Sequence, residues 1–148
     1  MAVKMNAMLI ICLVGALGVS SAGLSGAAVT SQDPHRVVLH LNSGDEKVQR
    51  GALNNIRNLY QEVGREHVRV ELVVHGAGLT LLTKKDSTLA SELAQLKAAY
   101  DVEFTACSNT MKSMNLTRSD LIDQVDRTVP AMVRLIELQE QGWIYIKP

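Results

Sequence analysis

Short apolar runs alternate with longer amphipathic stretches along most of this chain. Residues 36–42 and 68–74 are nearly continuous in apolar side chains, as strands covered on both faces tend to be. Residues 102–106 have the same character, and weaker strand signals occur at residues 124–128 and 143–146. The pattern therefore predicts five strands.

Amphipathic helices are predicted between these strands. Residues 45–63 place apolar side chains along one helical stripe, and Gly64 behind them can end the helix. The same spacing predicts a helix over residues 87–100, and Pro130 suits the first turn of a helix that reaches residue 141. A short helix is expected around Met111. Each of these helices lies between two predicted strands.

The order of the elements predicts the fold class. Connections between the predicted strands are too long for hairpins, which favours right-handed crossovers and a mostly parallel sheet. The crossover helices of such a sheet cover both of its faces. The sequence therefore predicts an α/β protein with three layers, α/β/α, around a mostly parallel five-stranded sheet.

The first residues have the pattern of a secretory signal peptide. Lys4 precedes an apolar stretch at residues 7–19, and small residues dominate residues 20–28. The apolar stretch is shorter than the roughly 20 residues that a membrane-spanning helix needs, which favours cleavage over the alternative of an uncleaved anchor. We therefore expect a periplasmic protein that does not contact the membrane after cleavage, with a signal peptide at 1–28, a flexible N-terminus at 29–35 and one α/β domain at 36–148.

The charge of the chain excludes one class of partner. The sequence carries 15 basic and 15 acidic side chains, and no basic run is longer than Lys84-Lys85. Binding of nucleic acid through charge needs a basic patch or stripe, and none is visible. We therefore expect no nucleic-acid partner.

The predicted mature chain keeps one cysteine, because Cys12 lies within the signal peptide. Cys107 therefore cannot form an internal disulfide, although exported proteins often use them. It follows the strand at 102–106 and precedes Ser108 and Asn109 at the start of a short predicted helix, where amides and the helix dipole stabilise a thiolate. The alternative is a small buried residue without a chemical role, as many free cysteines are.

Two histidines are predicted to lie near Cys107, because ligands of open α/β sheets bind beyond the carboxyl ends of the strands. His40 lies near the end of one predicted strand, and His75 ends another. His75 precedes Gly76-Ala77-Gly78, a turn whose amides could bind an anion. Ordinary core and loop roles for both histidines stay open. Beside Cys107 and His75 the candidate pocket residues are His40, Gly76, Gly78, Ser108 and Asn109.

A zinc site formed by His40, His75 and Cys107 would have an acceptable ligand set, but no two of these residues share a short metal-binding motif. We therefore expect no metal, and the sequence indicates no other cofactor. Hydrolysis by a Cys–His pair lacks an identifiable third residue to orient the histidine.

Three segments resemble the DsrE/DsrF-like family: residues 73–76 (VVHG), 102–111 (VEFTACSNTM) and 138–146 (LQEQGWIYI). The resemblance extends over residues 36–148. It implies a flavodoxin-like α/β/α fold of the YchN-like kind, homo-trimers or hexamers, and a cysteine that carries sulfane sulfur as a persulfide in a relay. It makes Cys107 the sulfur acceptor and His75 a neighbour that stabilises the thiolate or the persulfide anion. Relay members of the family work in the cytoplasm, whereas this chain is predicted to be exported.

These observations lead to two hypotheses. In the first, a periplasmic protein accepts sulfane sulfur on Cys107 and passes it on, with a donor or acceptor protein or a small sulfur compound as its partner. In the second, the same fold is a non-enzymatic module that binds a small ligand or acts as an oligomeric scaffold. Whether the protein is an enzyme stays open. For the homo-oligomer, the apolar residues 79–82 are the predicted contact between subunits.

Overall fold

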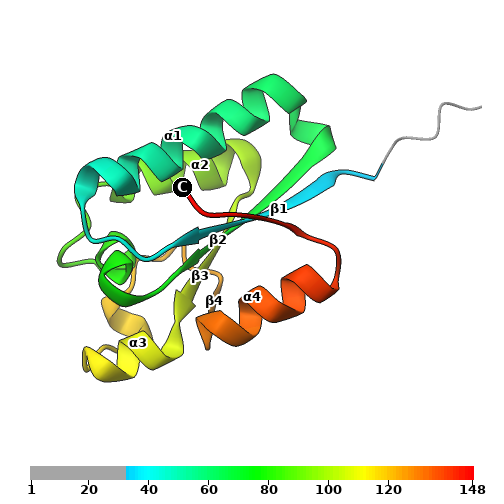
Figure 1. Cartoon of the computed structure of the whole chain (residues 1–148). Helices are drawn as coiled ribbons and strands as arrows, with labels where there is room; N and C mark the ends of the chain where they lie inside the picture. The colour runs from blue at the N-terminus through cyan, green and yellow to red at the C-terminus, as the bar shows by residue number, and fades with distance from the viewer. Residues whose placement is uncertain (1–32) are drawn as a thin grey trace, which may run out of the picture. The chain divides into compact units, whose positions relative to one another are not determined.

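Five parallel strands form the centre of residues 33–148, the part of the chain that the computed structural model describes (Figure 1). Their order across the sheet is β4-β3-β2-β1-β5, so β2 is central and β5 is an edge strand. The predicted three-layer α/β/α, flavodoxin-like fold with a five-stranded sheet is confirmed. The strands are β1 (His35–Leu41), β2 (Val68–Val74), β3 (Glu103–Cys107), β4 (Arg127–Val129) and β5 (Ile144–Ile146).

Four α-helices connect the strands, and α1 and α2 lie across the sheet from α4 (Figure 1). Short 3-10 helices occur at Arg65–His67, Gly76–Leu82 and Arg118–Asp120. None of the helices within residues 33–148 combines the length and the apolarity that a membrane span requires. The α-helices are α1 (Glu46–Val63), α2 (Ala90–Tyr100), α3 (Ser108–Ser113) and α4 (Ala131–Glu140).

Helix α1 shows how the local sequence sets an element. The carboxylate of Asp45 accepts hydrogen bonds from the amides of Lys47 (2.7 Å) and Val48 (3.2 Å), two of the amides that no turn of the helix can satisfy. Gly64 ends the helix with a φ of 98°, which a residue without a Cβ adopts at little cost. The predicted helix at 45–63 is thereby confirmed.

Alternation along the strands divides the interior into two cores of unequal size. Val37, Leu39 and Leu41 belong to the large core, which includes buried residues of α1 and α2. Val38 points to the other face, where a smaller cluster packs under α4. The polar side chains of His40, Glu71 and Thr105 are also buried on the α4 face. This face therefore contains the groups that could take part in chemistry.

Several boundaries differ from the prediction, most of them by one residue. The helix expected at 87–100 begins at Ala90, and the strand expected at 124–128 is shorter and later, at Arg127–Val129. The first strand begins at His35, one residue before the predicted domain boundary. The predicted signal peptide at 1–28, and most of the predicted flexible N-terminus at 29–35, lie outside the described residues.

The apolar segment 79–82 does not lie on the surface of the chain. Leu79, Leu81 and Leu82 are completely buried inside the chain, within the 3-10 helix Gly76–Leu82. The prediction that this segment forms a contact between subunits is therefore wrong. The connector between β2 and α2 buries its apolar side chains in the large core of its own chain.

Candidate functional site

Cys107 is the last residue of β3 and lies at the carboxyl edge of the sheet. It pairs with Val129 of β4 and faces α4, where it packs in the small cluster with Val38, Val73 and Ala131. Only 6% of its surface is exposed. The sequence thus predicted its place in the sheet, whereas its burial under α4 follows from the packing of that helix.

The sulfur of Cys107 is surrounded by hydrogen-bond donors. The amide of Ala131, the first residue of α4, donates to Sγ at 3.4 Å. The hydroxyl and amide of Thr110 and the amide of Asn109 are further donors that favour the ionised sulfur. Burial raises the pKa of the Cys107 thiol, but these donors outweigh burial and hold the pKa below its ordinary value. The Cys107 thiol therefore ionises more readily than the thiol of an ordinary cysteine.

Thr110 connects this sulfur to the turn after β2. Its hydroxyl accepts a hydrogen bond from the amide of Gly76 at 3.0 Å. Since the amide occupies a lone pair of the oxygen, the hydroxyl proton remains free to point at the Cys107 sulfur. Sequence reasoning did not single out Thr110. The available signal was its position three residues after Cys107, where the first turn of α3 brings its side chain back toward the strand end.

His75 and His40 form a second polar group at the same edge. Nε2 of His40 lies 2.6 Å from Nε2 of His75, and Nδ1 of His40 lies 2.6 Å from the hydroxyl of Tyr145. A single proton must lie between the two imidazoles. Burial lowers the pKa of both histidines, and in His40 the neighbouring His75 lowers it further. Both rings are therefore neutral at neutral pH, and Tyr145 is a further member that sequence reasoning missed.

The predicted site residues come together in part. His75 and Cys107 reach the same edge, but within residues 33–148 no hydrogen bond joins the imidazole to the sulfur. Asn109 contributes its backbone amide, and Ser108 begins α3 beside it. The turn at Gly76 and Gly78 is explained without a bound anion, because both amides have acceptors within the chain: Thr110 for Gly76, and Asn42 and His75 for Gly78.

Gly78 has a packing role. A Cβ at this position would lie 3.0 Å from the carbonyl oxygen of Leu41 and 3.1 Å from backbone atoms of Asn42. Glycine therefore allows the loop to pass directly over the end of β1, which brings His75 and His40 together.

In the described part of the chain, no group of three or more His, Cys, Asp or Glu side chains has the arrangement of a metal site.

Comparisons with known proteins identify a family. The model of the DsrE/DsrF-like family matches residues 36–148. MTH1491 from Methanobacterium thermoautotrophicum, a protein of unknown function, is 32% identical with a TM-score of 0.71, and the match covers 77% of this chain and 99% of that one. No functionally curated protein matches.

Two further solved structures share the fold at lower identity. The YchN protein from E. coli is 16% identical with a TM-score of 0.57, and the match covers 78% of this chain and 99% of that chain. BT1422 from Bacteroides thetaiotaomicron, a conserved protein of unknown function, is 15% identical with a TM-score of 0.54, covering 82% and 99%. At these identities the likeness concerns the fold alone.

Proposed function

This chain belongs to the DsrE/DsrF-like family, and on that premise we propose that it is a periplasmic sulfur-handling protein in which Cys107 accepts a sulfane sulfur atom and passes it on. Membership of the family suggests a role in sulfur relay in general. The observation that supports the specific proposal is the amide of Ala131, which donates to the Cys107 sulfur at 3.4 Å at the carboxyl edge of the sheet. Together with the Asn109 and Thr110 donors, it favours the thiolate that sulfur transfer requires.

The proposed step is an exchange between sulfur atoms without net redox change. The Cys107 thiolate attacks the outer sulfur of a donor persulfide, and a new sulfur–sulfur bond forms at Cys107. The bond between the two donor sulfurs breaks, and its electron pair leaves with the donor as a thiolate. Transfer onward is the same step in reverse, with an acceptor thiolate attacking the outer sulfur on Cys107. No metal or other cofactor takes part in this scheme.

His75 is proposed as the neighbour that stabilises the anionic sulfur. It lies at the same sheet edge, and the turn that follows it is tied to Thr110, which also contacts the Cys107 sulfur. A neutral imidazole can donate one hydrogen bond to a persulfide anion. The hydrogen bond between His40 and His75 then decides which nitrogen of His75 carries the proton.

Homo-oligomerisation, as a trimer or hexamer, belongs to the same proposal. Helix α4 and the edge strand β5 expose large apolar side chains. Isolated apolar residues are common on surfaces, but three on one helix and a row on an edge strand are typical of interfaces. Ile144 and Ile146 pair with Val37 and Leu39 and therefore lie on the face of the sheet opposite α4. A second copy of this chain is the proposed occupant. The exposed residues are Met132, Val133, Ile136, Ile144, Tyr145 and Ile146.

Mass spectrometry of the intact protein tests the sulfur step. Full-length protein carrying Cys12→Ala has Cys107 as its one cysteine, and it is incubated with polysulfide or with thiosulfate and a sulfurtransferase. We expect an increase of about 32 Da per accepted sulfur atom, removed by a reductant. The same protein with Cys107→Ser is the control and should gain nothing. A reduced, folded protein that takes no sulfur from either donor contradicts the proposal.

The second hypothesis, a non-enzymatic binding or scaffold module, is favoured by the low exposure of Cys107 and by the apolar surface of α4 and β5. It predicts that Cys107→Ser leaves assembly unchanged and that no sulfur is carried. The mass measurement and light scattering of the same two proteins therefore separate the two functions.

A further inference from the structure

A carboxylate is buried in the middle of the sheet. Glu71 of the central strand β2 is completely inaccessible to solvent and lies on the α4 face, two residues before Val73. Burial of an ionised carboxylate is costly unless it is paired and hydrogen-bonded. Its partners therefore have to be accounted for.

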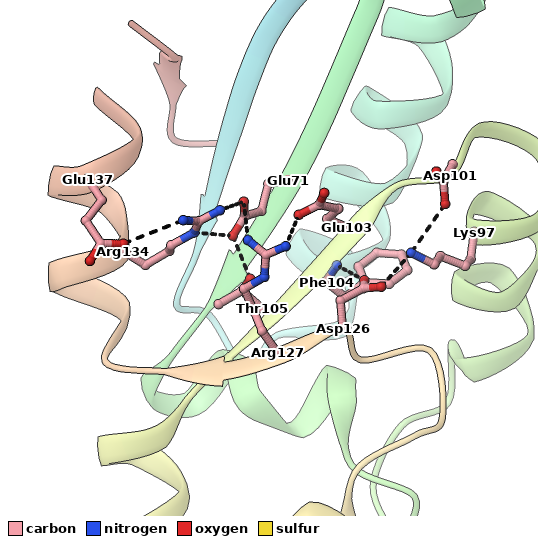
Figure 2. A network of polar contacts seen from close by, with 10 residues as sticks. All are labelled: Glu71, Lys97, Asp101, Glu103, Phe104, Thr105, Asp126, Arg127, Arg134 and Glu137. Atoms are coloured by element: carbon pink, nitrogen blue, oxygen red, sulfur yellow. Dashed lines mark hydrogen bonds and ion pairs between the residues drawn. The ribbon is translucent and has the colours of Figure 1, made fainter. Parts of the chain in front are cut away.

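Three elements supply those partners (Figure 2). Arg134 of α4 makes a bidentate pair with Glu71, from Nε to Oε1 at 2.9 Å and from Nη2 to Oε2 at 2.7 Å. The hydroxyl of Thr105 in β3 donates to Oε1 at 2.6 Å. Arg127 of β4 lies 3.4 Å from Oε2 and also pairs with Glu103. The carboxylate of Glu71 thus joins β2, β3, β4 and α4 at one point.

The same elements surround the Cys107 sulfur. Thr105 lies two residues before Cys107 on the same face of β3, and Arg127 lies two residues before Val129, the strand partner of Cys107. Arg134 lies one turn after Ala131, whose amide donates to the sulfur. Strands β3 and β4 and helix α4 are therefore each anchored to Glu71 two or three residues along the chain from the sulfur or its neighbours.

Apolar packing alone leaves the position of α4 weakly determined. Its buried apolar residues are Ala131, Leu135 and Leu138, whereas Met132, Val133 and Ile136 are half exposed or more. Apolar contact is non-directional, so a narrow seam permits the helix to slide along the sheet. A bidentate arginine–carboxylate pair has a fixed geometry and fixes the position of the helix.

We propose that Glu71 and Arg134 act as positioning residues that hold the first amide of α4 on the Cys107 sulfur, so that a buried ion pair remote from the sulfur supports its thiolate. This inference rests on the proposed function only for its biological use, because ionisation of the thiol is measured without any sulfur donor. Ala131 follows Pro130 at the start of α4, so its amide has no acceptor within the helix and is available to the sulfur.

Other charges do not account for the state of the thiol. The titratable side chains on the surrounding elements are Arg69 and Glu71 on β2, His75 after it, Glu103 on β3, Lys112 on α3, Arg127 on β4, and Arg134, Glu137 and Glu140 on α4. The shift of the Cys107 pKa comes from burial and from hydrogen-bond donors rather than from these side chains. The ion pair between Glu71 and Arg134 can therefore affect the thiol only through the position of these hydrogen-bond donors.

The test measures the alkylation rate of Cys107 against pH in full-length protein carrying Cys12→Ala. Arg134→Lys keeps the charge but cannot form two parallel hydrogen bonds with the carboxylate. We expect this variant to raise the Cys107 pKa. The double variant Glu71→Gln with Arg134→Met should raise the pKa by about one pH unit, which lowers the alkylation rate about tenfold at a pH below the pKa. The double variant leaves no unpaired charge on Glu71 or Arg134 and serves if Arg134→Lys does not fold.

Glu137→Gln is the matched control on the same helix. Glu137 is exposed and pairs with Arg134 at 3.5 Å without touching Glu71, so its variant should keep the wild-type Cys107 pKa. Folded Arg134 variants with an unchanged pKa would overturn the inference. A wild-type thiol that ionises readily but takes no sulfur would instead contradict the proposed function and leave the positioning intact.

Discussion

The amide of Ala131 donates to the sulfur of Cys107, and α3, the 3-10 helix Arg118–Asp120 and β4 lie between the two residues along the chain. The amide belongs to the first turn of α4 and has no acceptor within that helix. Cys107 therefore satisfies a buried donor, whatever chemistry it performs. Replacement of Cys107 is therefore expected to change the stability of the fold as well as the chemistry of the site.

Cys107→Ala is expected to destabilise the protein more than Cys107→Ser does. Alanine leaves the Ala131 amide without an acceptor, which costs about 1–3 kcal/mol, whereas the serine oxygen can still accept. Urea unfolding monitored by circular dichroism gives the free energies of unfolding. Equal stability of the two variants would show that the amide does not depend on the side chain at position 107.

Thr110→Val is expected to raise the Cys107 pKa. The variant removes the hydroxyl that contacts the sulfur and leaves the Gly76 amide without its acceptor. Thr110→Ser keeps the hydroxyl and is the control. The pKa is read from the rate of alkylation against pH, and we expect an increase of up to about one, the size of one modest hydrogen bond. Identical profiles for the valine and serine variants would exclude Thr110 from the site.

The histidine pair is expected to make stability depend on pH. Burial lowers the pKa of His40 and His75 from 6.5, so the unfolded chain binds protons more readily than the folded one. Stability contributed by the neutral pair is therefore present above pH 6.5 and is lost as the pH falls from 6.5 through the lower folded pKa values. Urea midpoints measured across this range should decline toward acid.

A variant without the pair provides the comparison. His40→Gln with His75→Gln should show a flatter decline over the same range, because glutamine does not titrate. Superimposable pH profiles for the variant and the wild type would mean that other groups cause the acid lability. His67 is exposed and lies in a 3-10 helix, so His67→Gln should leave the profile unchanged.

Removal of the buried carboxylate is expected to be costly. Glu71→Ala leaves Arg134 without its bidentate partner and Arg127 without one of its two, and such a loss in the interior costs about 3–5 kcal/mol. Glu137→Ala removes an exposed partner of Arg134 and should cost less than about 1 kcal/mol. Urea unfolding at one pH compares both with the wild type. A difference of zero between them would mean that Glu71 is not an ionised partner.

Disruption of the apolar surface is expected to dissociate the proposed oligomer. Ile136 on α4 is 56% exposed, and Ile136→Glu places a charge among the exposed apolar side chains of that helix. Light scattering at micromolar concentration should show a trimer or hexamer for the wild type and a smaller species for the variant. Gln61→Glu, an exposed change on α1, is the control. A wild-type monomer would remove the assembly from the proposal.

The regular elements were largely predictable because their signals are local. Periodicity and end residues located β1, α1 and β2 within a residue or two, since burial on one stripe or on both faces leaves a direct imprint on sequence. The short strand β4 was misplaced. Its three half-buried residues carry no periodic pattern, and its position is set by pairing with β3.

The candidate site was predictable only in outline. Cys107 and His75 were expected at one edge because parallel strands end on the same side of a sheet. Tyr145 was missed because no spacing along the chain relates it to His40, which it contacts from a distant strand. Thr110 was missed although its position three residues after Cys107 was a local signal. The segment 79–82 was misread as an outer contact, because apolarity alone does not say which core a side chain enters.

By itself, the amino-acid sequence determined the succession of strands and helices, their parallel arrangement, the family and the edge of the sheet where Cys107 lies. Tertiary structure alone decided that Cys107 is enclosed, that the first amide of α4 reaches its sulfur, and that Glu71 holds four elements together. The reason is physical. Apolar periodicity is written in neighbouring residues, whereas a hydrogen bond between distant residues depends on how helices and strands are placed against one another.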